Sequence, residues 1–337
     1  MRAIVQDRYG SVDDLRLAEV ETPTPADDEV LVRVRAASVH ADVWHVVAGL
    51  PYVLRLMGSG LSRPEHPIPG TDLAGVVEAV GAKVSRWKPG DEVFGETHRG
   101  MQWVNGGAFA EYAAVPEDVL ASKPSQVGFE AAATVPTSGL IALFNLEQVG
   151  LPTTGQHVLV NGAGGGVGTI ALQVAKAHGA TVTAVDRSEK FELLRQLGAD
   201  HLIDYRHQDF TRGTERYDLI FDVASNLRFF DCTRVLTRAG KYLLIGHDHY
   251  GTRGRRVLGS LPQLFGLVPL TPFTRHLPKL NFSMVIDKAR LIEALRALLE
   301  SEQLTPVVAQ AFPLAEASEA LRYLMTGEAL GRIVLTP

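Results

Sequence analysis

A glycine-rich turn between a short apolar strand and a helix most constrains the fold of this chain. The segment reads Val158-Leu159-Val160-Asn161-Gly162-Ala163-Gly164-Gly165-Gly166-Val167-Gly168. Glycines allow the tight turn and let backbone N–H groups approach a pyrophosphate, which then lies at the positive end of the helix. The sequence therefore predicts a dinucleotide-binding turn whose cofactor contacts are Gly162, Ala163, Gly164, Gly165, Gly166, Val167 and Gly168.

The residues after the next predicted strand, over 181–185, bear on which dinucleotide binds. Asp186 lies 18 residues past Gly168, close to the roughly 20-residue offset at which a carboxylate bonds the adenosine ribose. This acid favours NAD, because a carboxylate repels the 2′-phosphate of NADP. Arg187 and Lys190 follow it and could bind that phosphate. We expect these three side chains at the adenosine end of the cofactor, and both NAD and NADP stay open.

Strands and helices alternate through the second half of the chain. The predicted strands cover 157–160, 181–185, 201–204, 219–222 and 242–245, with helices at 166–178 and 189–197. Such alternation predicts parallel βαβ units and a doubly wound sheet. This α/β region, residues 126–285, is the expected Rossmann dinucleotide-binding domain.

The first part of the chain has a different pattern. Its strands are short and separated by turns, as in 29–36, where apolar and polar residues alternate. A mostly antiparallel β domain is therefore expected. The C-terminal segment, with its last predicted strand at 332–335, reads as a return of the chain to this domain, so residues 1–125 and 286–337 are assigned to it.

Composition limits the partners and the compartment. The chain has 337 residues, a formal net charge of −5 and no long run of one sign, which argues against nucleic acid or an anionic membrane as a partner. No apolar signal region or ~20-residue apolar span is found, so a cytoplasmic location is expected. The one cysteine, Cys232, rules out an intrachain disulfide and any multi-cysteine zinc site, and is expected to be buried.

Several motifs together resemble the medium-chain dehydrogenase/reductase superfamily. They are Pro69-Gly70-Thr71-Asp72-Leu73-Ala74-Gly75, Lys88-Pro89-Gly90-Asp91-Glu92-Val93, the glycine turn and the closing Gly331-Arg332-Ile333-Val334. The resemblance implies a GroES-like β domain, a Rossmann domain and a substrate bound between them. Gly70-Thr71-Asp72 in place of Gly-His-Glu is similar to the zinc-independent, quinone oxidoreductase-like branch.

The resemblance also bears on zinc. The catalytic zinc ligands of zinc-dependent relatives correspond here to His40, Thr71 and Thr134, and histidine alone among these ligates zinc well. No zinc is therefore expected, although a residual site made by His40 and Asp72 stays open. Without a metal, the substrate oxygen depends on hydrogen-bond donors and on the hydride donor itself.

The segment 39–49 carries the expected catalytic residues. In zinc-dependent relatives the matching stretch supplies a ligand, a hydroxyl and a histidine, and the last two form a proton relay; this chain has His40, Asp42 and His45. We expect His45 to contact the nicotinamide ribose and relay protons, with Asp42 orienting it or handling the proton. His40 would donate to the substrate oxygen. The alternative is that Asp42 and His45 form a structural hydrogen-bonded pair.

Other candidates lie in loops and at strand ends. Tyr52, in the extended loop 50–67, is expected to line the substrate site or to pack. Thr137 resembles a nicotinamide contact of relatives, and Gly246 and His247 follow a strand whose end points toward the ligand crevice. The apolar region 265–282 is expected to form a homodimer interface.

These observations favour an NAD(P)-dependent oxidoreductase that transfers hydride to a quinone, an enone or a reactive carbonyl. One alternative is a zinc-dependent NAD(P) alcohol dehydrogenase. Another is a non-enzymatic nucleotide- or nucleic-acid-binding protein that has kept the fold. The substrate itself cannot be deduced from the residues, because it depends on a site built from loops.

Overall fold

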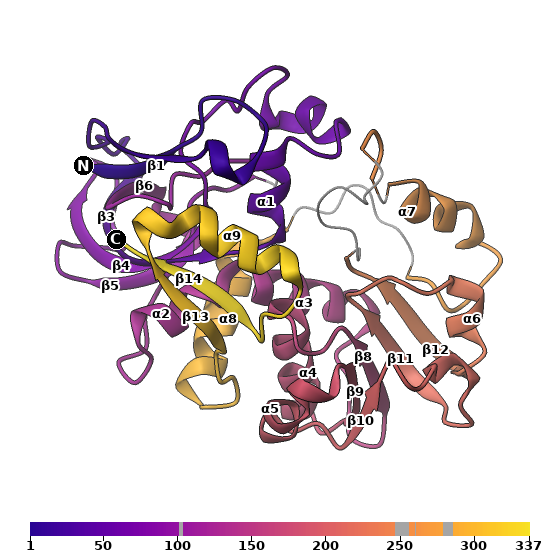
Figure 1. Cartoon of the computed structure of the whole chain (residues 1–337). Coiled ribbons are helices and arrows are strands. Elements are labelled where there is room, and N and C mark those ends of the chain that lie inside the picture. Colours follow the sequence, from indigo (N-terminus) through magenta and orange to yellow (C-terminus); the bar gives the residue numbers. More distant parts are fainter. Residues whose placement is uncertain (101–103, 247–255, 260, 279–285) are drawn as a thin grey trace.

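The computed structural model describes residues 1–100, 104–246, 256–259, 261–278 and 286–337. These residues form two sheets with helices between and around them (Figure 1). Within them, no helix is long and apolar enough to cross a membrane. The cytoplasmic location stays a prediction.

The parallel sheet confirms the strand–helix alternation. Across the described part of the chain it holds five strands in the order β10-β9-β8-β11-β12, with all neighbouring pairs parallel. The strands are β8 (His157–Asn161), β9 (Thr181–Asp186), β10 (His201–Asp204), β11 (Tyr217–Asp222) and β12 (Leu236–Leu244). The chain reverses its winding direction between β8 and β11, and ligands of such sheets bind at the carboxyl ends of strands beside this switch.

Burial explains why the central strand is so apolar. Val158, Leu159 and Val160 of β8 are each at most 1% exposed, as expected for a strand covered on both faces. Helices follow the strands: α4 (Gly166–Ala177), α5 (Phe191–Gln196) and α6 (Phe229–Thr233). The predicted helix over 189–197 is thus a 3-10 turn, η4 (Ser188–Lys190), continued by α5.

The second sheet confirms the mostly antiparallel domain. Its strand order is β13-β14-β3-β4-β5-β7, and β6 also pairs with β3. The strands are β3 (Glu29–Val39), β4 (Asp72–Val80), β5 (Glu92–Glu96), β6 (Tyr112–Pro116), β7 (Leu120–Ser122), β13 (Val308–Pro313) and β14 (Arg332–Thr336). β14 pairs antiparallel with β3, so the C-terminus does return to the first domain. A separate hairpin joins β1 (Arg2–Val5) and β2 (Arg16–Glu19).

One helix in the first domain was not predicted. α1 (Ala41–Ala48) contains the β-branched Val43, Val46 and Val47, which have low helix propensity. Those valines and Trp44 are each at most 5% exposed. Tertiary burial of this face outweighs the local preference for a strand.

Two helices connect the sheets. α3 (Pro136–Val149) and α8 (Lys288–Glu300) pack closely, because Gly139 has no side chain where it meets Leu295. α2 (Phe129–Ala133) precedes α3, and α9 (Ala317–Thr326) covers the C-terminal strands (Figure 1).

The remaining elements are short. They are the 3-10 turns η1 (Val12–Asp14), η3 (Glu117–Val119), η5 (Phe210–Arg212), η7 (Val268–Leu270) and η8 (Leu314–Glu316), the π-helical turn η2 (Arg55–Ser59), and α7 (Leu261–Leu267). η2, α7 and η7 lie in the two loop regions that the sequence left unassigned. The domain boundaries at 125–126 and 285–286 stay a prediction.

Candidate cofactor and active site

The glycine turn has the geometry that a dinucleotide requires. It joins the end of β8 to the start of α4, and Gly162 has φ +83°, a left-handed conformation that favours glycine. A Cβ on Gly168 would lie 2.2 Å from the backbone oxygen of Gly162. The backbone therefore closes to a distance that no other residue tolerates. The first N–H groups of α4, which have no partner within the helix, lie at the end of this turn.

Asp186 is positioned at the end of β9, next to this turn. Its carboxylate accepts hydrogen bonds from the backbone N–H groups of Gly164 (2.7 Å) and Arg187 (2.8 Å). Lys190 Nζ lies 3.6 Å from the same carboxylate. The acid is 7% exposed, so much of its hydrogen-bonding capacity is already used by the protein.

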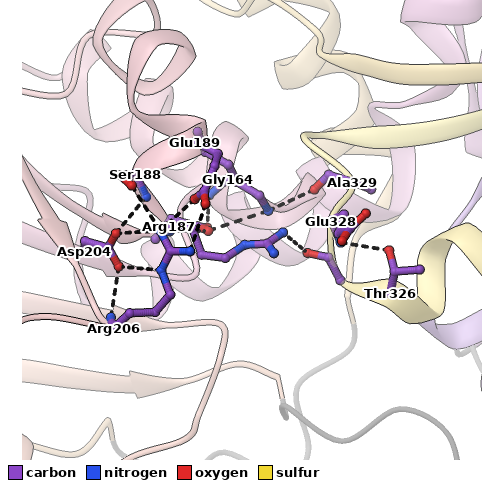
Figure 2. Close-up of polar contacts among 12 residues, drawn as sticks. Gly164, Arg187, Ser188, Glu189, Asp204, Arg206, Thr326, Glu328 and Ala329 are labelled. Atoms are coloured by element: carbon purple, nitrogen blue, oxygen red, sulfur yellow. Dashed lines mark hydrogen bonds and ion pairs between the residues drawn. The ribbon is translucent and has the colours of Figure 1, made fainter.

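The two cations after Asp186 contact the C-terminal segment between α9 and β14. Arg187 donates to the carbonyl of Gly327 (3.0 Å), and Lys190 donates to the carbonyl of Ala329 (2.9 Å). Figure 2 shows Arg187 extending toward this segment, while the neighbouring Arg206 is paired with Glu189 and Asp204. At that segment both cations donate to neutral carbonyls, but Lys190 also faces the carboxylate of Asp186, so the charge of Arg187 is the more available to an anion.

Arg332 is a candidate that the sequence motifs did not single out. It is the first residue of β14, is 8% exposed, and donates from Nε to Ser138 Oγ at 2.5 Å. A Cβ on Gly166 would lie 2.3 Å from that Nε, so the guanidinium is close to the start of α4. Burial lowers the pKa of Arg332 to about 9, and among the described residues no carboxylate forms an ion pair with it.

A buried cation at a helix N-terminus is a favourable site for a pyrophosphate. Gly331 N–H also donates to Gly164 O at 2.9 Å, which fixes the closing strand on the turn. The residues present therefore fit a dinucleotide.

The predicted catalytic residues lie at the start of α1, directly after β3. His40 is 1% exposed; its Nε2 is 2.9 Å from Thr71 Oγ1 and its Nδ1 is 3.5 Å from Asp42 Oδ2. The Asp42 side chain is 18% exposed. The structure brings His40 and Asp42 together, but it buries the ring that was expected to face the substrate.

His45 lies one turn further along α1. Its Nδ1–H donates to the carbonyl of Leu50 at 2.7 Å, because a carbonyl only accepts. The ring is 4% exposed, and burial, partly offset by the charge of Asp42, lowers its pKa. His45 is therefore a neutral imidazole near pH 7, with its Nδ1 hydrogen fixed by the backbone.

A cluster of buried polar groups lies behind His40. Asp72 and Glu96, at most 1% exposed, both contact the hydroxyl of Thr137, and Lys288 forms an ion pair with Glu96. The hydroxyl of Thr137 is thus used inside the protein, and the neighbouring Ser138 is the one that contacts Arg332. A cofactor contact of Thr137 stays a prediction.

The remaining predicted site residues are Tyr52, Gly246 and His247. Tyr52 is 43% exposed, and its ring stacks on the guanidinium of Arg55, which also stacks on Tyr9. Tyr52 N–H and Val53 N–H donate hydrogen bonds to the backbone oxygens of residues 256 and 257. These bonds join the loop 50–67 to the segment before α7. Gly246 packs against Val223, and His247 lies outside the described residues.

Cys232 is buried, as predicted, and burial raises the pKa of its thiol well above the usual range.

The positions that hold zinc in zinc-dependent relatives do not fit a metal here. Thr134 Oγ1 donates to Ala131 O, Thr71 Oγ1 contacts His40, and Asp72 is bonded to Ser38 and Thr137. In the described residues, no group of three or more His, Cys, Asp or Glu side chains could hold a metal ion. We therefore derive no catalytic step through zinc.

The two sheets, the glycine turn and the closing strand define a two-domain, nucleotide-dependent dehydrogenase or reductase. Residues 26–125 match the family model described as an alcohol dehydrogenase GroES-like domain, and residues 197–335 match one described as a zinc-binding dehydrogenase. Over the whole chain, the sequence is 32% identical to a 2-methylene-furan-3-one reductase of Solanum lycopersicum, covering 79% of that protein.

Two further comparisons give relatives that are named quinone oxidoreductases. The chain is 31% identical to the chloroplastic quinone-oxidoreductase QR1 of Triphysaria versicolor, with 100% of this chain and 98% of that protein covered. The solved quinone oxidoreductase of Coxiella burnetii superposes with a TM-score of 0.80 at 26% identity, over 100% of this chain and 99% of that one. The chain belongs to the medium-chain dehydrogenase/reductase superfamily, within its quinone oxidoreductase-like branch.

Proposed function

We propose that this oxidoreductase transfers hydride from NADPH to a quinone or to an enone. The observation that carries the proposal is the glycine turn with buried Arg332 at the start of α4, which provides backbone donors and a cation for a pyrophosphate. Support for the acceptor comes from the relatives, one named a quinone oxidoreductase and one named for a conjugated ketone.

NADPH rather than NADH is proposed from the adenosine end of the site. Asp186 directs its carboxylate to the backbone of Gly164, so it is less available to the ribose. Arg187 and Lys190 flank it, and their partners in the C-terminal segment are uncharged. A 2′-phosphate would add charge-assisted hydrogen bonds to both cations.

The bound nicotinamide supplies the hydride, and the protein supplies position and a proton. The turn and Arg332 would hold the pyrophosphate, which places the nicotinamide toward the carboxyl ends of β8 and β11. His40 and Asp42, 3.5 Å apart, are the groups proposed to hold the proton that the reduced substrate takes up. His45 is proposed to orient the ribose as a neutral imidazole.

Oxidation of NADPH and NADH by chelator-treated protein tests this function. With a quinone and enone panel, turnover that survives chelation and favours NADPH is expected. Activity lost on chelation and restored by Zn²⁺ would instead show a zinc-dependent alcohol dehydrogenase. If neither NADPH nor NADH is oxidised with any substrate of the panel, a non-enzymatic role is favoured.

We also propose a homodimer. Phe265 and Phe273 are 55% and 88% exposed, and the rest of the apolar region 265–282 lies partly outside the described residues. Exposed phenylalanines of this kind favour a protein–protein contact. Light scattering across a range of protein concentrations should give twice the mass of the chain.

A further inference from the structure

Two buried carboxyl groups share one hydroxyl. Asp72, at the start of β4, and Glu96, at the end of β5, are 0% and 1% exposed. Thr137 Oγ1 lies 2.5 Å from Asp72 Oδ1 and 2.7 Å from Glu96 Oε1. A hydroxyl has one hydrogen and donates to one acceptor. Both short contacts are hydrogen bonds only if one carboxyl group is itself protonated and donates to the hydroxyl oxygen.

The surroundings decide which acid carries the proton. Lys288, on α8, forms an ion pair with Glu96 and stabilises its carboxylate. Asp72 is faced by Glu96 and by His40, whose Nε2 is 3.9 Å from Asp72 Oδ1. Burial and the charge of Glu96 raise the pKa of Asp72 to about 8. The proton therefore resides on Asp72, which donates to Thr137, and Thr137 donates to Glu96.

A line of polar atoms connects this acid to the predicted catalytic residues. Asp72 Oδ1 is also 3.3 Å from Thr71 Oγ1, which is 2.9 Å from His40 Nε2. On the other side of the ring, His40 Nδ1 is 3.5 Å from Asp42 Oδ2. Asp42, with its side chain 18% exposed, is the member of the line most accessible from outside. The two longer contacts, at 3.3 and 3.5 Å, can shorten when substrate binds.

We propose that Asp72 stores the proton that completes the reduction and passes it through Thr71 to His40. The proposal rests on the proposed function, because hydride transfer leaves the substrate with an extra electron pair that takes up one proton. His40 releases its Nδ1 proton to the substrate through Asp42. His40 Nε2 then takes the Thr71 hydroxyl proton. The O–H of Asp72 turns from Thr137 to Thr71, and Thr71 Oγ1 takes its proton.

Each transfer breaks one O–H or N–H bond and forms another, the last acceptor is the substrate, and the net result is one proton moved from Asp72 to the substrate. Asp72 ends as a carboxylate beside Glu96, which is unfavourable in a buried site. After the product leaves, water returns a proton along the same line in reverse, which restores both the proton of Asp72 and the Nδ1 proton of His40. Asp72 does not touch the substrate. It acts on the substrate only through His40 and is therefore a positioning residue.

The first test compares Asp72→Asn with Ser38→Ala. Asparagine keeps the size and a donor to Thr137 but cannot release a proton. Ser38→Ala removes a 3.0 Å hydrogen bond to the other oxygen of Asp72, Oδ2, away from the line. With an enone substrate, Asp72→Asn should lower kcat on the order of 10²-fold with an unchanged KM for NADPH. Ser38→Ala should keep wild-type kcat.

The pH profile and the solvent isotope effect separate the relay from a structural role. The protonated form of Asp72 is the active one, so wild-type kcat should fall as the pH rises through about 8. This limb should be absent from Asp72→Asn, together with the solvent deuterium isotope effect on kcat. A wild-type kcat and pH profile in Asp72→Asn would overturn the relay.

A measurement that needs no turnover tests the proposal even if a variant is inactive because it folds poorly. Infrared spectra of the cofactor-free wild type at neutral pH should contain the C=O stretching band of a protonated carboxyl group, which Ser38→Ala keeps and Asp72→Asn loses. Thr71→Val should keep the band but lose turnover. Absence of the band from the wild type would overturn the proposal, whereas a wild type with the band that oxidises no NADPH would overturn the proposed function instead.

Discussion

At the scale of single residues, absent side chains matter as much as present ones. Gly168 approaches Gly162 O so closely that any Cβ would clash with backbone. Backbone atoms move only with the whole turn, so the cost of a methyl group there cannot be absorbed by a rotamer change. The cofactor site therefore depends on the shape of the main chain, and side chains such as Arg332 add charge to it.

Gly168→Ala tests this dependence. The new methyl group would lie 2.2 Å from Gly162 O, and the turn must open to accept it. We expect a rise of at least about tenfold in the Kd for NADPH and a stability loss of about 1–3 kcal/mol, measured by fluorescence titration and thermal unfolding. Gly128→Ala is the control: Gly128 has φ −67° and nothing within 4 Å of its Cβ position. Equal effects of the two substitutions would refute the argument.

His45→Ala tests the proposed ribose contact. Because burial lowers the pKa of His45 below its usual value, the ring is neutral at pH 7 and above, and its contribution to kcat should not vary with pH there. We expect kcat with NADPH to fall on the order of 10²-fold. His178→Ala, at the end of α4 remote from the glycine turn, should keep wild-type kcat. Unchanged cofactor affinity and turnover in His45→Ala would leave a structural role for the residue.

At the scale of elements, the C-terminal segment after α9 contacts the proposed cofactor site. It belongs to the antiparallel sheet through β14, yet its carbonyls accept hydrogen bonds from Arg187 and Lys190 of the Rossmann domain (Figure 2). The proposed adenosine end of the site thus includes residues from both sides of the molecule, Arg187 and Lys190 on one and the C-terminal segment on the other. A 2′-phosphate bound there would have to share these two cations with the segment.

Arg187→Ala tests the preference for NADPH. Loss of one charge-assisted hydrogen bond to the 2′-phosphate should lower kcat/KM for NADPH about tenfold, equivalent to about 1.4 kcal/mol. The value for NADH should stay within about twofold, since NADH lacks that phosphate. Arg195→Ala, on the exposed side of α5, is the control. A parallel loss for both cofactors would show that Arg187 supports the C-terminal segment instead.

The elements that the sequence predicted are those with local signals. The glycine turn was found because its residues are adjacent, and the parallel strands because each is a short apolar run between helices. α1 was missed because its valines favour a strand until tertiary burial is known. The Arg332–Ser138 and Thr137–Asp72 contacts join residues 194 and 65 positions apart. No spacing rule relates such pairs, so the buried part of the candidate site required the structure.

At the scale of the whole molecule, a buried ion pair joins α8 to the antiparallel sheet. Lys288 begins α8 and contacts Glu96 at the end of β5, and it also donates to the backbone oxygens of His98 and Gly100. Both its side chain and that of Glu96 are at most 6% exposed. α8 packs in turn on α3, whose first turn contacts Asp72 and the closing strand. This ion pair therefore fixes the position of α8 against the antiparallel sheet and supports the site indirectly.

Lys288→Met should be costly because it leaves Glu96 buried without its cation. Removal of one partner of a buried pair costs about 3–5 kcal/mol, and we expect a loss of that size in the free energy of unfolding in urea. The double variant Lys288→Met/Glu96→Gln removes the uncompensated charge and should regain most of it. Arg86→Met is a matched control, since Arg86 also links α8 to the first domain through Glu293, but with both side chains 38% exposed. Its cost should stay within about 1 kcal/mol. A similar cost for Arg86→Met and Lys288→Met would mean that burial of the pair does not determine how strongly α8 is held against the antiparallel sheet.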